Sequence, residues 1–137
     1  GMGAFLATMD FMERHLVVEH LWSYGRRLLE LMQERARAHG VAEYFKVGGA
    51  PCSPYYVTLD GDGKASNALR TLFSQEMIRN GVLMPWIALS YRHGDQELAA
   101  TGRALDAALA VYRRAMEDGV QGYLLGPAIK PVFRKYN

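Results

Sequence analysis

The chain has 137 residues, a net charge of +2, and 50% hydrophobic against 22% charged residues. That length is typical of one domain, and that balance is typical of a globular rather than a disordered chain. The basic residues are scattered, so neither nucleic acid nor an anionic membrane is an expected partner. One cysteine, Cys52, and the lack of an apolar run near the roughly 20 residues of a membrane span favour a cytoplasmic protein without disulfides.

Two helices are predicted at the start of the chain. Residues 3–14 are apolar on nearly every side, a pattern typical of a buried helix. We therefore expect residues 1–15 to form a buried or interface helix, covered by another domain or by a second copy of the chain. Residues 17–39 repeat apolar side chains at three- and four-residue spacing and stop at Gly40, a natural left-handed C-cap. Gly25 inside this helix predicts a close packing contact.

A pair of strands follows. The runs 44–47 and 55–59 are rich in β-branched and aromatic residues, and the Gly- and Pro-rich residues 48–54 predict a loop between them. Asp60-Gly61-Asp62-Gly63 predicts a tight turn. A calcium loop fails at this place, since its sixth position would be alanine and its twelfth threonine.

The second half predicts a helix over 65–80, short strands at 82–84 and 86–91 around Pro85, and a long helix over 95–118 that opens with acidic residues. Strands that come in adjacent pairs favour an α+β fold with a small, mainly antiparallel sheet packed by helices. The expected organisation is the helix at 1–15, a small α+β domain at 16–118 and an extended tail at 119–137 that docks on the surface.

Little chemistry can be read from the residues alone. No histidine has a second ligand at the spacing of a zinc site, and no phosphate-binding glycine loop is present, so no metal site is predicted. Cys52 has no recognisable base and is expected to be inert. Several aromatic residues fall in predicted strands, where they are typical of a core: Tyr44, Phe45, Tyr55, Tyr56, Trp86 and Tyr91.

Four segments together carry a resemblance to a known family. Residues 4–32 read AFLATMDFMERHLVVEHLWSYGRRLLELM and residues 72–85 read LFSQEMIRNGVLMP. Residues 87–98 read IALSYRHGDQEL and residues 104–119 read ALDAALAVYRRAMEDG. In order and spacing they resemble the C-terminal small domain of class III pyridoxal-phosphate aminotransferases, in the branch of glutamate-1-semialdehyde aminomutase. No single motif is specific, and the resemblance covers most of residues 3–118.

The resemblance implies an enzyme whose chemistry lies elsewhere. In that family the lysine that binds pyridoxal phosphate and the other cofactor-binding residues precede the segment matched here, and Lys46, Lys64, Lys130 and Lys135 do not match the lysine's context. We therefore expect no catalytic and no cofactor-binding residue in this chain, and no activity from the chain alone. Its expected role is to supply a wall of the substrate entrance and dimer contacts, with a missing cofactor domain or a second copy as partner.

Trp86, Ser90 and Arg92 are the candidates for lining a substrate site, because the family places substrate-facing groups on the matching strand. Many relatives carry an arginine there for a substrate carboxylate, whereas this chain reads Trp-Ile-Ala-Leu-Ser and reaches its first arginine at Arg92. A core tryptophan with helix-capping polar residues explains the same positions. A stand-alone interaction or ligand-binding module therefore stays open as the alternative function.

Overall fold

A computed structural model describes residues 1–130, so the end of the expected extended tail (131–137, with Lys135) lies outside the described part. Within that part the order is α1 (Met2–Arg14), α2 (Val17–Ala38), β1 (Phe45–Ala50), β2 (Ser53–Thr58), α3 (Asn67–Arg79), α4 (Asp95–Asp118) and a 3-10 turn, η1 (Val120–Tyr123). The fold is α+β with a small antiparallel sheet, as the sequence predicts.

The sheet of the described chain is a hairpin of β1 and β2, paired from Phe45 opposite Thr58 to Ala50 opposite Ser53. The strands are joined by a two-residue turn, tighter than the loop expected over 48–54, because both strands extend into that glycine- and proline-rich stretch. Side chains alternate between the two faces of a strand, and here Phe45, Tyr56 and Thr58 are buried while Lys46 is exposed.

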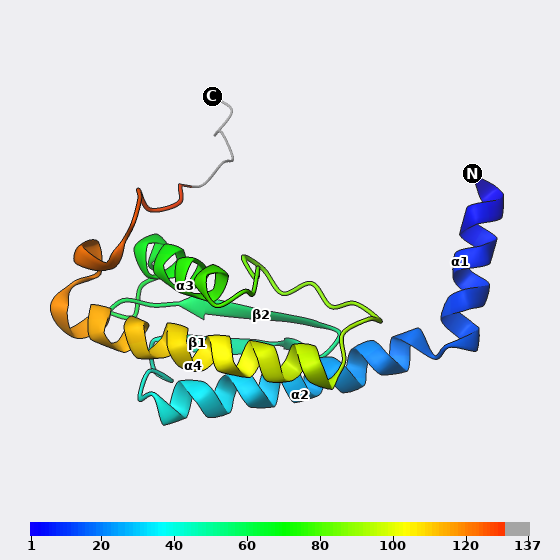
Figure 1. Cartoon of the computed structure of the whole chain (residues 1–137), viewed down its shortest axis with the longest axis horizontal. Coiled ribbons are helices and arrows are strands. Elements are labelled where there is room, and N and C mark those ends of the chain that lie inside the picture. Colours follow the sequence, from blue (N-terminus) through cyan, green and yellow to red (C-terminus); the bar gives the residue numbers. More distant parts are fainter. Residues whose placement is uncertain (131–137) are drawn as a thin grey trace.

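The helices cover one face of this hairpin (Figure 1). α2 and α3 contact the strands, and α4 packs between these two helices. α4 reaches the hairpin through Tyr112, whose hydroxyl donates to the carbonyl oxygens of Tyr44 and Leu59. The three helices and the hairpin thus enclose one continuous core.

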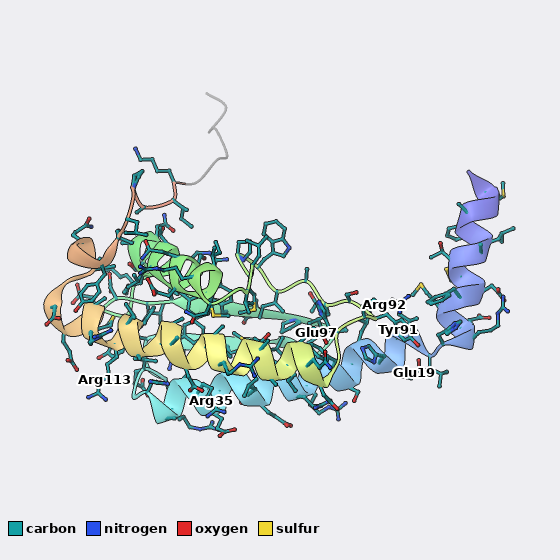
Figure 2. All side chains as sticks on the ribbon, viewed as in Figure 1. Glu19, Arg35, Tyr91, Arg92, Glu97 and Arg113 are labelled. Carbon is teal, nitrogen blue, oxygen red and sulfur yellow. The ribbon has the colours of Figure 1, made fainter. Side chains whose placement is uncertain are left out.

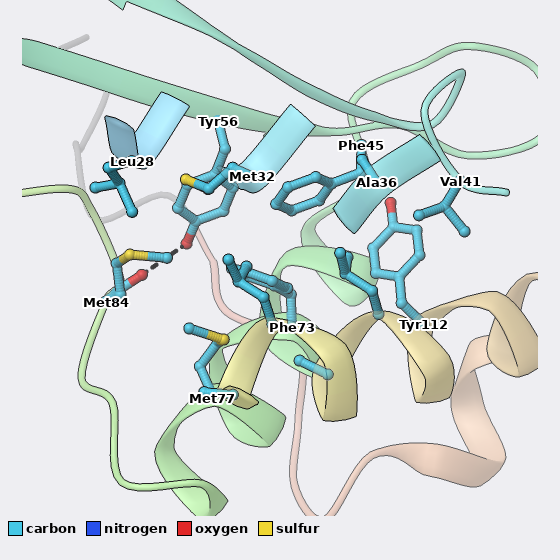
Figure 3. Close-up of a cluster of buried hydrophobic side chains, with 14 of the residues drawn as sticks. Leu28, Met32, Ala36, Val41, Phe45, Tyr56, Phe73, Met77, Met84 and Tyr112 are labelled. Atoms are coloured by element: carbon cyan, nitrogen blue, oxygen red, sulfur yellow. Dashed lines mark hydrogen bonds between the residues drawn. The ribbon is translucent and has the colours of Figure 1, made fainter. Parts of the chain in front are cut away.

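Aromatic rings and methionines fill this core (Figure 3). The ring of Phe73 lies 4.7 Å from that of Phe45 and 4.9 Å from that of Tyr56, measured between centroids. The helices α2, α3 and α4 and the hairpin form the body of the molecule. Fully buried side chains come from α2, β1, α3, α4 and the loop before β1: Met32, Val41, Phe45, Leu72, Phe73, Met77, Leu105, Leu109 and Tyr112.

Gly25 marks the closest approach of α2 to the hairpin. A Cβ atom at this position would lie 1.7 Å from the carbonyl oxygen of Pro51 and 2.8 Å from Cδ1 of Leu89. The prediction of a close packing contact at this glycine is confirmed, and the contact is with the backbone of the hairpin turn.

The strands predicted at 82–84 and 86–91 are wrong, because residues 82–92 form a loop without ladder pairing. Pro85 has no N–H to donate, and side chains take the carbonyls that a strand neighbour would use. Arg70 donates to the Pro85 carbonyl oxygen over 2.7 Å, and the Tyr56 hydroxyl lies 3.0 Å from that of Met84.

α1 projects away from the rest of the molecule (Figure 1). It is separated from α2 by Leu16, whose backbone is left-handed (φ 49°), and none of its residues is buried. Only its last turn touches the body, where the ring of Phe11 packs edge-on against Tyr91. The chain itself thus leaves this apolar helix uncovered, and a covering domain or second copy stays a prediction. None of the described helices combines the length and the apolar character that crossing a membrane requires.

Candidate functional site

The candidate site is a groove of about 410 Å³ between the loop at 81–89 and the facing sides of α2 and α4. Its size is within the range of about 300–1,000 Å³ that small-molecule sites occupy. The lining is mostly apolar: Leu28 from α2, the loop residues from Val82 to Leu89, and Ala100 from α4. A small number of polar groups interrupt this surface, as in most ligand sites.

Side-chain hydrogen bonds hold the loop in its middle and just beyond its end. In the middle, Tyr56 and Arg70 bind the carbonyls of Met84 and Pro85, and the Arg70 guanidinium lies 4.7 Å from the centre of the Tyr56 ring. Beyond the end, Nε2 of His20 lies 2.9 Å from the carbonyl oxygen of His93. The groove therefore has a wall fixed at two points to the core and to α2.

His93 closes this end of the groove. Its Nδ1 accepts a hydrogen bond from the backbone N–H of Ser90 over 3.2 Å. Its ring packs at 5.5 Å from that of Tyr24, which also lines the groove.

Glu97 supplies the fixed charge of the site, at the start of α4 (Figure 2). Its Oε2 accepts a hydrogen bond from the backbone N–H of Gly94 over 2.8 Å, and this bond holds the pKa of the carboxyl below its ordinary value. Burial raises the pKa of Tyr24 on the facing helix, and the charge of Glu97 raises it further. The groove thus contains a carboxylate beside a protonated phenol.

The three sequence-predicted site residues do not all reach the groove. Trp86 lines it and is 70% exposed, so it is not a core tryptophan. Ser90 lies outside the lining. Its Oγ accepts a hydrogen bond from the backbone N–H of Arg92, which is a local polar contact and not a contact with the groove. Arg92 is exposed and also lies outside the lining, near Tyr91 at the end of the loop closest to α1 (Figure 2). Substrate contact by these residues stays a prediction.

Sequence reasoning missed Tyr24, His93 and Glu97 as site residues. Tyr24 falls in the apolar stripe of its helix, a pattern that predicts a core residue, and it does lie in the core. Glu97 was interpreted as an acid that favours a helix start, a role it also has. The signal that could have found them is the loop itself, since a proline-interrupted run beside an acidic helix start leaves room for a groove.

The groove does not fit pyridoxal phosphate, because no lysine lines it. Nζ of Lys46 lies 3.6 Å from Glu43 on the far face of the hairpin, Lys64 lies in the turn after β2, and Lys130 is exposed in the tail. A Schiff base needs such an amine beside the bound ring, so no step through the cofactor can be derived from the described residues.

The described residues also contain no group of three or more His, Cys, Asp or Glu side chains that could hold a metal ion. His15 and His20 bind backbone carbonyl oxygens, and His39 pairs with Asp106 over 3.1 Å. Cys52 lies half-buried in the hairpin turn.

Over most of its length the chain is similar to an aminotransferase. It is 28% identical over 119 residues to a 3-aminobutyryl-CoA aminotransferase of Cloacimonas acidaminovorans, a match that covers 85% of this chain and 28% of the relative. The chain thus spans little more than a quarter of that relative's length. No family model matches the chain, and no solved structure matches it.

Proposed function

We propose that this chain is the C-terminal domain of an aminotransferase-like, pyridoxal-phosphate-dependent enzyme, without the half that binds the cofactor. In the whole enzyme it would supply one wall of the substrate entrance and part of a dimer contact. The observation that carries the proposal is the similarity to an aminotransferase over 119 residues, which account for only 28% of that relative.

The groove supports the role of a substrate wall. It is bounded by a loop anchored to the core, and it presents Trp86 and Glu97 without any lysine. Such a surface can bind and orient a substrate, while the amine and the groups that hold the cofactor must come from another domain.

α1 supports the role of a contact surface. Phe5 is 63% exposed and Leu6 60% exposed, although apolar side chains of this size normally avoid water. A missing cofactor domain or a second copy of the chain would remove them from water.

The alternative is a non-catalytic module that binds a small ligand or a partner. The groove favours it too, because its volume and its mixture of apolar and polar groups suit a ligand without any cofactor.

The test is to read the coding sequence that flanks this chain and to co-express the chain with any lysine-bearing cofactor domain found there. We expect a co-purifying complex that gains a visible absorption band with pyridoxal phosphate and transfers amino groups. The chain alone should give no saturable band. A saturable band from the chain alone that one lysine substitution abolishes would contradict the proposal, as would a flanking sequence without such a domain.

A further inference from the structure

One carboxylate belongs to the lining of the groove. It is that of Glu97, and the lining contains no arginine and no lysine. Arg27 binds Asp95 over 2.7 Å, and Arg70 binds the Pro85 carbonyl oxygen from the core side. His93 also lines the groove, where its Nδ1 accepts the backbone N–H of Ser90 and its proximity helps to lower the pKa of the Glu97 carboxyl.

Glu97 is fixed in place as well as charged. The bond from Gly94 commits one carboxylate oxygen to the backbone at the first turn of α4. The hydroxyl of Thr101 donates to the Glu97 carbonyl oxygen over 2.8 Å and belongs to the lining too. A ligand therefore meets a carboxylate whose position is set by the helix and not by a mobile side chain.

The remainder of the lining is apolar and partly exposed. Trp86 is 70% exposed and Leu83 78% exposed, and Leu28 and Met84 form the buried side of the groove. An indole face attracts cations as well as hydrocarbon, and burying aliphatic carbon against such a surface stabilises a complex.

We propose that this groove binds a small apolar amine, with its ammonium group at Glu97 and its hydrocarbon body against Trp86 and Leu28, and that it discriminates against carboxylates. A carboxylate would find no arginine or lysine in the lining and would be repelled by Glu97. The binding site rests on the residues of the groove alone. In the whole enzyme, the groove would be the subsite for an amine that has no free carboxylate nearby. That role rests on the proposed function.

The experiment titrates the full chain with three probes of equal length: n-hexylamine, 1-hexanol and hexanoate. Tryptophan fluorescence reports binding, in a Trp22→Phe background that leaves Trp86 as the reporter. Because one surface carboxylate attracts the ammonium group and repels the carboxylate, and solvent screens both effects, we expect hexylamine to bind about tenfold more tightly than hexanoate. Hexanol should fall between them.

Glu97→Gln is the decisive variant, because the amide oxygen of glutamine can still accept the bond from Gly94. It should weaken hexylamine to the level of hexanol and leave hexanol unchanged. Glu30→Gln, which removes an equal charge from the exposed face of α2, is the matched control and should change nothing.

Four results would overturn the proposal. Three are no saturable change with hexylamine, equal binding of hexylamine and hexanoate, and an unchanged preference in Glu97→Gln. The fourth is a Trp86 signal that changes with protein concentration alone, which would show that a second copy covers the groove. Amine binding by the chain, together with a flanking coding sequence that holds no cofactor domain, would sink the proposed function only. A working complex whose groove ignores amines would sink this inference only.

Discussion

α1 and α4 are both helices with an apolar surface, yet they end up in opposite environments. α4 buries eight residues in the core, including Leu105, Leu109 and Tyr112, whereas α1 buries none. The apolar residues of α4 form a stripe that matches one neighbouring surface, and those of α1 surround the helix. The rest of the chain can cover the single stripe of α4, but it cannot cover a helix such as α1 that is apolar on every side.

The two helices differ in whether the described chain covers their apolar side chains. The body of α2, α3, α4 and the hairpin has a closed core of its own. α1 has apolar side chains that nothing in the described chain covers, and a partner that covers them stays a prediction. The predictions below separate these two kinds of region.

The largest expected difference in the free energy of unfolding is between replacing a phenylalanine of the core and replacing one of α1. Phe73→Ala should lower the free energy of unfolding by about 3–5 kcal/mol, because it leaves a cavity among fully buried rings. Phe5→Ala should change it by no more than about 0.5 kcal/mol in dilute protein, where α1 is uncovered. Urea unfolding followed by circular dichroism measures both. A large loss in Phe5→Ala would show that α1 belongs to the core.

Two helical glycines extend the same comparison to the backbone. Gly25→Ala should cost about 1–3 kcal/mol, because its Cβ would collide with the Pro51 carbonyl group. Gly3→Ala is the matched control: nothing lies within 4 Å of its Cβ, and alanine should stabilise α1 by up to about 1 kcal/mol. Thermal melting of the two variants beside the unmodified chain checks the opposite signs. Equal signs would contradict the packing of α2 on the hairpin turn.

The course of the chain was predictable because local patterns control it. The helix over 95–118 has the predicted bounds, and the stop at Gly40 has the predicted left-handed backbone (φ 68°). The loop at 82–92 was mistaken for strands because its apolar composition suits a strand. Arg70 and Tyr56 decide that this segment is a loop, because they donate hydrogen bonds to its carbonyl oxygens. Both are distant in the sequence, so no local pattern contains that information.

Alkaline pH should weaken the body. Burial raises the pKa of Tyr112 and of Tyr56 above the ordinary value of 10.0, so the unfolded chain loses these protons before the folded chain does. Stability should be complete below pH 10 and should fall above it by about 1.4 kcal/mol per pH unit for Tyr112 alone. Urea unfolding at several pH values gives the slope, which Tyr112→Phe should reduce. An unchanged slope in that variant would contradict the burial of this hydroxyl.

The smallest expected effect concerns the attachment of the loop to the body. Tyr56→Phe removes the hydroxyl that binds the Met84 and Pro85 carbonyls and should cost about 0.5–1.5 kcal/mol. Faster hydrogen exchange in the loop should accompany the loss. Tyr55→Phe, at an exposed position of the same strand, should alter neither quantity. Equal effects of the two substitutions would show that the loop does not depend on this anchor.

The candidate site could be predicted less well than the fold. Trp86 could be predicted as a candidate because the resemblance singled out its segment. Tyr24 and Glu97 could not, because they lie 73 residues apart in the sequence and come together only across the groove. Such a meeting depends on how α2 packs against α4. The same dependence removed Ser90 and Arg92 from the groove, since the loop turns away at its end.

The most direct test of α1 as a contact surface is sedimentation velocity of the isolated chain over a wide range of concentrations. We predict that the chain self-associates as its concentration rises, because a second copy is the available cover for the apolar side chains of α1. Phe5→Ser combined with Leu6→Ser should keep the protein monomeric without changing its unfolding. A chain that remains well folded and strictly monomeric at high concentration would contradict the account of α1.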